Sequence, residues 1–178
     1  MKQWTTLMLA RSGIISALYV ALTYACLPVA SGASQFRLSE MLTVLPLFYV
    51  EAIPALTIGC LLSNIISGCS VWDIFLGTAI TLVAATGTYY AGKIFRHPAP
   101  RILLGGAFPV FLNALGLPLI WILAGAPDLV YLIEVGYLTL SQGVIIWGLG
   151  CALYLIVTAL LKKNVSALKP VPLSELKK

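Results

Sequence analysis

Two ionisable residues and an amide mark the stretch of this chain whose residue types could do chemistry. Arg37 and Glu40 lie three positions apart at the mouth of an apolar run, a spacing that puts two residues on one face of a helix. Asn64 follows beyond a break at Glu51 and Pro54. A carboxylate accepts two N–H groups side by side, and an amide offers both a donor and an acceptor. The pattern indicates a site for a small polar molecule, or alternatively an Arg37–Glu40 ion pair that closes a helix end.

The composition of the 178-residue chain places these groups in lipid. Hydrophobic residues make up 60% of the chain and charged residues 10%, whereas a soluble domain carries roughly 25% charged residues. Several apolar runs approach the length of about 20 residues that crosses a bilayer. The chain is therefore predicted to be an all-α integral membrane protein. Inside a membrane each polar group is costly and marks a functional site by default.

The basic residues indicate how the chain is oriented. The net charge is +5, and most basic side chains flank or connect apolar segments, namely Lys2, Arg11, Lys93, Arg96, Arg101, Lys162, Lys163, Lys169, Lys177 and Lys178. Short basic connections stay in the cytoplasm, so this charge reports orientation and predicts no nucleic-acid partner. The four cysteines stand singly, without metal-ligand spacing, and no metal or other cofactor is predicted.

The number of membrane helices depends on residues 39–66, which form either one long bent helix or two shorter ones. Both termini and the 93–101 connection are basic, and the positive-inside rule places all three on one side. That requires six transmembrane helices with both termini cytoplasmic, over about residues 12–29, 39–50, 53–67, 73–93, 102–123 and 135–161. Residues 1–162 then form the transmembrane domain, 163–178 a polar cytoplasmic tail, and 28–34 an outer Gly/Ser loop.

The predicted helix over 39–50 is short for a membrane span. It rises only about 18 Å, against a hydrocarbon core of about 30 Å. Non-helical backbone that extends such a helix is tolerated only where protein covers it. Glu40 and its neighbours are therefore expected to be enclosed by other helices. Asp73, at the start of the fourth helix, is expected to cap it.

Two apparent catalytic patterns do not predict an enzyme. Residues 87–93 (GTYYAGK) match most of a phosphate-binding loop, but Ile94 follows where a magnesium-binding hydroxyl is needed, and the segment lies in a membrane helix. ATP hydrolysis would therefore require another subunit. The histidine, His97, is predicted at the inner face, far from Ser39 and Glu40 at the outer face, so no nucleophile–histidine pair forms.

The remaining polar groups predict a pocket rather than a pore, because those in the outer half face a closed, apolar inner half. They are Arg37, Glu40, Asn64, Asn113 and Gln142, with Trp72, Trp121, Tyr131 and Tyr137 available for stacking. Such acceptors, donors and aromatic faces suit a small planar heterocycle. The alternative for Asn113 and Gln142 is hydrogen bonding between helices.

Small residues recur at four-residue spacing in the first helix, at Ala17, Ala21 and Ala25. Residues four apart share one helix face, so this stripe allows another helix to approach closely. The neighbour is either a partner protein or another helix of this chain.

Three segments carry a family resemblance: FRLSEMLTVLPLF, EAIPALTIGCLLSNIISG and DIFLGTAITLVAA. They resemble the QueT family, which comprises substrate-binding S components of energy-coupling factor (ECF) transporters. The resemblance covers about residues 10–161. It implies a six-helix S-component-like bundle in the cell membrane that captures a queuosine precursor, a 7-deazaguanine such as the 7-aminomethyl form, from outside.

The resemblance also implies partners. An S component associates with a transmembrane scaffold subunit and two ATPase subunits that drive uptake, and the Ala17–Ala21 stripe resembles the motif by which S components dock. Two other functions remain open. One is an S component for a different vitamin, and the other is a non-transporting membrane scaffold protein that only recruits partners.

Overall fold

The protein is described by a computed structural model over residues 5–26, 37–125, 130–165 and 168–170. All regular structure in these ranges is helical, which confirms the predicted all-α class. The elements are α1 (Thr6–Cys26), η1 (Leu38–Leu47), α2 (Ala52–Ile66), η2 (Asp73–Gly77), α3 (Thr78–Ile94), α4 (Pro98–Leu123), α5 (Tyr131–Gly143), η3 (Val144–Leu149) and α6 (Gly150–Lys162). The predicted loop over 28–34 lies outside the described residues.

These elements combine into six helices. The π-helical turns η2 and η3 join their neighbours, so that Asp73–Ile94 and Tyr131–Lys162 each run as one long helix. With Thr6–Cys26 and Pro98–Leu123 they are the four described helices that are long and apolar enough to cross a membrane. The other two, η1 and α2, are shorter, and residues 48–51 separate them. The segment over 39–66 therefore contains two helices, as the six-helix count requires.

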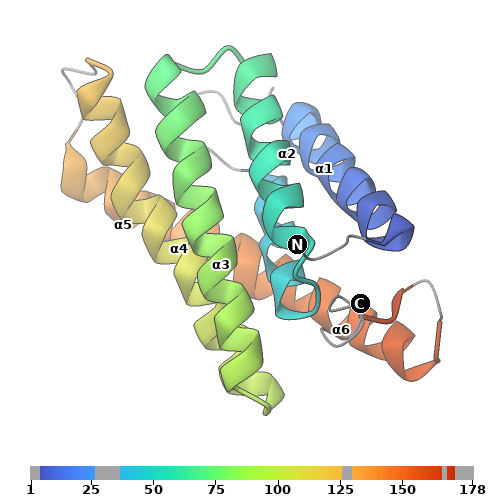
Figure 1. Ribbon diagram of the computed structural model, residues 1–178. Coiled ribbons are helices and arrows are strands. Elements are labelled where there is room, and N and C mark those ends of the chain that lie inside the picture. Colours follow the sequence, from blue (N-terminus) through green and yellow to red (C-terminus); the bar gives the residue numbers. More distant parts are fainter. Residues whose placement is uncertain (1–4, 27–36, 126–129, 166–167, 171–178) are drawn as a thin grey trace.

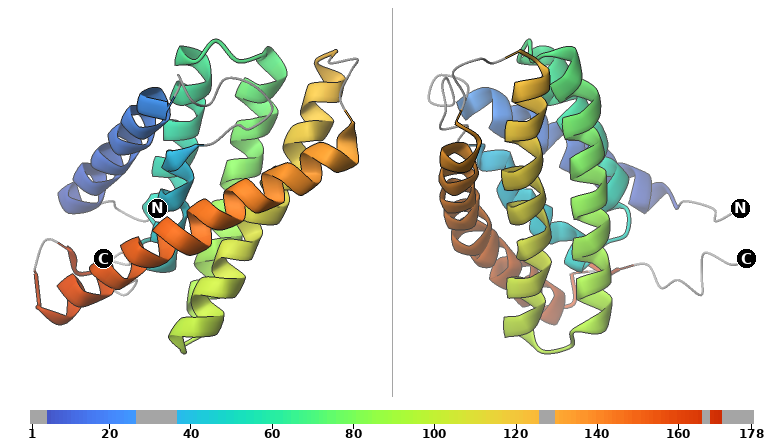
Figure 2. Two further views of the ribbon diagram at one scale, coloured as in Figure 1. Left: turned by 180° about the vertical axis from the view of Figure 1, so that it is seen from behind. Right: turned by 90° about the vertical axis from the view of Figure 1, so that its left-hand side faces the viewer.

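The helices form a bundle with one oblique member (Figures 1 and 2). Helices α2, α3 and α4 are packed in sequence order, α5 packs on α4, and α1 packs chiefly on α2 and η1. The continuous helix α5–η3–α6 crosses the others diagonally, as the left view of Figure 2 shows. Helix α1 begins at Thr6, before its predicted start at residue 12, so Arg11 lies within the helix and is buried. Helices α4 and α5 also begin earlier than predicted, at Pro98 and Tyr131.

The centre of the bundle is η1, a 3₁₀ helix of ten residues, eight of which are buried. Three glycines on surrounding helices make room for it. A Cβ atom at Gly92 would lie 2.8 Å from the Leu47 carbonyl oxygen, and one at Gly105 would lie 2.7 Å from the Leu47 side chain. At Gly150 a Cβ would approach the Met41 carbonyl to 3.4 Å. The expectation that protein encloses this short helix is met by α3, α4 and α6.

Side chains supply the backbone hydrogen bonds that η1 and the prolines leave open. Pro109 has no N–H to donate to the Gly105 carbonyl one turn earlier, and the Thr88 hydroxyl donates to that carbonyl at 2.8 Å instead. Arg101 likewise donates to the Leu47 carbonyl at the end of η1. Buried carbonyls need such partners where water is absent.

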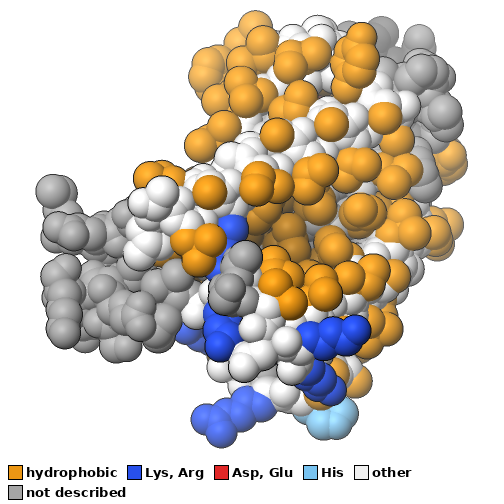
Figure 3. Space-filling model, turned by 90° about the vertical axis from the view of Figure 1, so that its right-hand side faces the viewer, with side chains coloured by type: hydrophobic (Ala, Val, Ile, Leu, Met, Phe, Trp, Pro, Cys, Tyr) orange, Lys and Arg blue, Asp and Glu red, His pale blue; other side chains and the backbone are white. Residues whose placement is uncertain are grey.

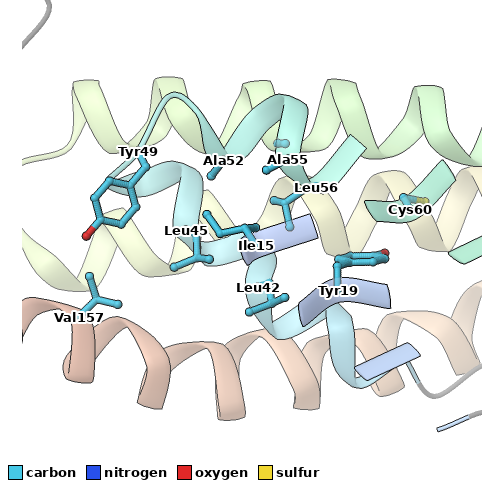
Figure 4. Close-up of a cluster of buried hydrophobic side chains, with 11 residues drawn as sticks. Ile15, Tyr19, Leu42, Leu45, Tyr49, Ala52, Ala55, Leu56, Cys60 and Val157 are labelled. Carbon is cyan, nitrogen blue, oxygen red and sulfur yellow. The ribbon is translucent and has the colours of Figure 1, made fainter. Parts of the chain in front are cut away.

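A hydrophobic core surrounds η1. Leu42 and Leu45 of η1 gather with Ile15 and Tyr19 of α1 and Val157 of α6 (Figure 4). The outer surface is also apolar over a broad face, whereas Lys and Arg side chains and the histidine collect at one end (Figure 3). An apolar exterior with charge at one end is what a lipid-embedded bundle requires.

We predict that Gly92→Ala destabilises the protein, because its methyl group would collide with the backbone of Leu47. Overpacking of this kind costs about 1–3 kcal/mol, although alanine favours a helix by about 1 kcal/mol over glycine. The matched control is Gly13→Ala on α1, where a Cβ meets no atom within 4 Å. Thermal unfolding in detergent should rank Gly92→Ala below wild type and Gly13→Ala at or above it. Equal melting temperatures for the two variants would contradict the close contact.

Candidate binding site

The first turn of η1 carries a buried carboxylate, Glu40, whose side chain is 3% exposed. The Tyr19 hydroxyl on α1 donates to Glu40 Oε1 at 2.7 Å, and the Asn113 amide on α4 donates to Oε2 at 3.3 Å. Both carboxylate oxygens therefore have a donor from a different helix. Next to Glu40, the Thr23 hydroxyl donates to Ser39 Oγ at 2.8 Å. Helices α1 and α4 thus fix the orientation of Glu40.

A second chain of hydrogen bonds begins at Arg37, which donates to Asn64 Oδ1 at 3.1 Å. The amide nitrogen of Asn64 donates to the Asp73 carbonyl at 3.0 Å. The Asp73 carboxylate accepts from Trp121 Nε1 at 3.2 Å and from the Ser70 hydroxyl at 2.7 Å. This chain links the connection before η1 with the ends of α2, η2 and α4.

Helix capping at Asp73 differs from the expectation. The Asp73 backbone N–H donates to Ser70 Oγ at 3.2 Å, while the Ser70 hydroxyl donates to the Asp73 carboxylate. Ser70 is therefore the residue that caps the helix, and Asp73 is its partner three positions on, a variant of the capping box. The spare Asp73 oxygen is free to accept from Trp121.

The expected contact between Arg37 and Glu40 is replaced by other pairs. Arg37 is the N-cap residue of η1, with an extended backbone at φ −103° and ψ 101°, and its carbonyl accepts the Glu40 N–H at 3.1 Å. The two residues are therefore one 3₁₀ turn apart, as expected. Their side chains nevertheless hydrogen-bond to different partners, which are Asn64 for Arg37 and Tyr19 and Asn113 for Glu40. The helix-end ion pair considered above is therefore wrong for the described residues.

Of the other predicted site residues, Gln142 is buried and two aromatic residues are not. Gln142 on α5 is 1% exposed, and its Oε1 has no hydrogen-bond partner. Trp72 and Tyr137 are 52% and 47% exposed, and the structure does not bring them to the Glu40 cluster. Trp121 is the aromatic residue that joins the polar network. Spacing in the sequence alone could not distinguish inward-facing from lipid-facing rings.

A separate polar cluster lies at the other end of α2 and was missing from the sequence prediction. Arg11 and Glu51 form a buried ion pair at 2.9 Å. Arg11 also donates to the Lys169 carbonyl at 2.6 Å and lies over the Tyr49 ring, 5.0 Å from its centroid. The Tyr49 hydroxyl donates to the Leu168 carbonyl at 2.8 Å. The available signal was Glu51 itself, because a buried carboxylate needs a counter-charge.

The inward face of α1 is polar and tightly packed. The Ser16 hydroxyl donates to the Ala55 carbonyl at 2.6 Å, and the Ser12 hydroxyl to the Glu51 carbonyl at 3.3 Å. A Cβ atom at Gly59 would lie only 2.8 Å from the Cβ of Tyr19. Helix α1 therefore contacts α2 closely through serine, tyrosine and glycine.

The alanine stripe lies on the other side of α1. Ala17, Ala21 and Ala25 are all exposed, and Gly13, one turn before Ala17, has open space around it. Packing within the described chain does not use this stripe.

These features define an all-helical integral membrane protein with a buried polar cluster built around one carboxylate. The same sequence matches the family model described as QueT transporter over residues 9–159. Because that match covers most of the chain, the protein belongs to the QueT transporter family. The resemblance found in the sequence is thus confirmed.

A curated relative agrees with this assignment over part of its length. The protein named queuosine precursor transporter QueT from Lactococcus lactis subsp. cremoris (strain MG1363) is 40% identical over 85 residues. The match covers 47% of this chain and 50% of the relative, so this chain spans about half of that protein's length. No solved structure matches the chain.

We predict that Glu51→Gln lowers the stability of the protein. The variant leaves Arg11 buried without its counter-charge, and breaking a buried ion pair in this way costs about 3–5 kcal/mol. Thermal unfolding in detergent measures the loss. The control is Lys162→Gln, which removes an exposed charge and should change stability by about 0.5 kcal/mol or less. A Glu51→Gln protein as stable as the control would assign the pair no structural role.

Proposed function

We propose that this protein is the substrate-binding S component of an ECF transporter and that it captures a queuosine precursor from outside the cell. The ligand class is a 7-deazaguanine, such as 7-aminomethyl-7-deazaguanine. Membership of the QueT transporter family and the name of the relative support this substrate class. The single observation that carries the binding role is Glu40, a buried carboxylate whose side-chain hydrogen-bond donors among the described residues, Tyr19 and Asn113, are both neutral.

The chemistry of recognition follows from the partners of Glu40. A guanine-type edge presents two adjacent N–H donors, which match the two oxygens of one carboxylate. Those oxygens offer about four lone-pair sites, so Tyr19 and Asn113 can keep their bonds while the ligand adds its own. Arg37, Asn64, Asn113 and Gln142 complete the proposed site. Trp121 takes the stacking role instead of the exposed Trp72 and Tyr137.

The orientation follows from the positions of the charges. Lys93 and Arg101 lie at the two ends of the α3–α4 connection, and the basic end of the molecule is the one that contains the histidine (Figure 3). By the positive-inside rule this end faces the cytoplasm, which puts both termini and the tail over 163–178 inside. The Arg37–Asn64 network then lies in the outer half, where an external ligand arrives.

The energy for uptake has to come from partner subunits. The GTYYAGK segment lies within α3, where Gly87 and Gly92 make room for Phe108 and Leu47, so these glycines have a packing role rather than a phosphate-binding one. We therefore propose that a transmembrane scaffold subunit and two ATPase subunits complete the transporter, and that this chain is not an enzyme. The exposed stripe of Ala17, Ala21 and Ala25 is the proposed docking face.

We predict that Glu40→Gln weakens binding of 7-aminomethyl-7-deazaguanine by roughly tenfold to a hundredfold. The substitution keeps the size of the side chain but turns one acceptor into a donor that faces a donor, and an unmatched buried group costs about 1–3 kcal/mol. Titration of the purified protein measures the affinity, and circular dichroism checks that the helices are retained.

The matched control is Glu51→Gln, which removes a buried carboxylate at the opposite end of α2. It should lower stability without lowering the affinity of the folded protein. Equal affinities for Glu40→Gln and wild type would remove Glu40 from the site. Binding of a different vitamin, with no binding of 7-deazaguanines, would favour an S component of another specificity. Absence of ATPase subunits on co-purification would favour a non-transporting scaffold protein.

We predict that Ala21→Trp abolishes uptake while ligand binding stays close to wild type. The indole would project from the exposed face of α1, opposite the residues that contact α2, and would block close approach of a partner helix. Uptake by cells and titration of the purified variant separate the two effects. The control is Val83→Trp at another exposed position, on α3. This variant should keep the wild-type uptake and the wild-type ligand affinity. Normal uptake by Ala21→Trp would contradict the docking role.

A further inference from the structure

Two acceptor oxygens on one side of α5 are buried without a partner. They are Oε2 of Glu134 and Oε1 of Gln142, and neither has a hydrogen-bond partner among the described residues. The two residues are eight positions apart, with Leu138, which is fully buried, midway between them. Residues at four-residue intervals lie on one face of a helix. This face of α5 therefore carries one carboxylate oxygen and one amide oxygen that have no donor among the described residues.

Such groups call for an explanation, because the large majority of buried side-chain polar atoms in proteins have a hydrogen-bond partner. A carboxylate in the first turn of a helix benefits from the helix dipole, which accounts for the position of Glu134. The helix dipole does not explain why a buried oxygen of Glu134 has no donor. It also does not explain why Gln142 Oε1, two turns further on, has none. A molecule that brings N–H groups would satisfy both.

The packing of α5 against α4 indicates which α4 residues lie at the same level as these two groups. Gly106 of α4 lies against Ile146 and Trp147, and Leu138 packs with Ala114 and Leu117. This antiparallel register puts Gln142 opposite positions 110–113 and Glu134 opposite positions 118–121. The first range ends at Asn113, which donates to Glu40, and the second ends at Trp121, which donates to Asp73.

Among the described residues, no basic side chain forms an ion pair with Glu134. Of the described basic residues, Arg37 is the one in the polar networks near this end, and it donates to Asn64. Arg11 is paired with Glu51 at the other end of α2, and Lys93 and Arg101 lie at the α3–α4 connection.

We propose that the inward face of α5 makes the site selective for a positively charged ligand. Gln142 accepts an N–H of the ring at the depth of Asn113 and Glu40, and Glu134 binds a primary ammonium group on an arm that points towards the outer end. The eight positions correspond to about 12 Å along the helix, a span comparable to the length of a bicyclic ring with a one-carbon amine arm. This inference rests on the proposed function, since it names the form of 7-deazaguanine that the site takes.

The test compares two ligands that differ only in the charged group, 7-aminomethyl-7-deazaguanine and 7-methyl-7-deazaguanine. Wild-type protein should bind the amine at least tenfold more tightly, the size expected for a hydrogen bond to a charged group. Glu134→Gln should lose most of this preference while its affinity for the methyl compound stays within about twofold. Gln142→Leu should lower the affinity for both ligands by about the same factor, because it removes a contact to the ring that they share.

The control variant Glu51→Gln should keep the wild-type preference for the amine. Equal binding of the two ligands by wild type, or an unchanged preference in folded Glu134→Gln, would overturn the role of α5 while leaving the proposed function intact. The wild-type comparison decides the question even if a variant does not fold. Failure of folded wild type to bind either ligand would instead overturn the proposed function, and the inference with it.

Discussion

The structure depends on enclosing a 3₁₀ helix in the middle of an apolar bundle. Helix η1 is too short to cross a membrane, and no water is available in the bilayer core to form hydrogen bonds with its backbone groups. Glycines on α3, α4 and α6 let the surrounding helices reach its backbone and side chains, and Arg101 caps the carbonyl of Leu47 at its end. The bundle can therefore keep an irregular element at its centre because every side of that element is covered.

Enclosing η1 also creates the polar cluster. Glu40 lies in the first turn of this helix and would be an unpaired buried charge without Tyr19 and Asn113, which approach from α1 and α4. Helix α1 has two different faces as a result. Its inward face is hydrogen-bonded to η1 and α2, whereas its outward face carries the exposed residues Ala17, Ala21 and Ala25. A partner that moves α1 would thus act on a helix bonded directly to Glu40.

The buried carboxylates near the two ends of α2 have different kinds of partner. Glu51 is paired with Arg11, and the carbonyls of Leu168 and Lys169 add further bonds around that pair. Among the described residues, the side-chain donors to Glu40 are neutral, and Glu134 Oε2 and Gln142 Oε1 have no donor. A cluster whose charges are paired can stabilise a fold. A cluster with unpaired hydrogen-bond acceptors can bind a ligand that brings donors. This asymmetry distinguishes the structural end of the molecule from the proposed binding end.

The sequence by itself determined the membrane class, the six helices, the break between η1 and α2, and the family, because apolar length, proline position and motif similarity are local properties of the chain. It also located Glu40, Asn64, Asn113 and Gln142 as buried polar groups. Only the tertiary structure decided their partners. Tyr19 and Glu40, or Arg11 and Glu51, meet because helices distant in the chain approach within hydrogen-bonding distance, and Trp72 and Tyr137 face outward because helix rotation is set by packing. No local pattern encodes those approaches, so they could not be predicted from residue spacing.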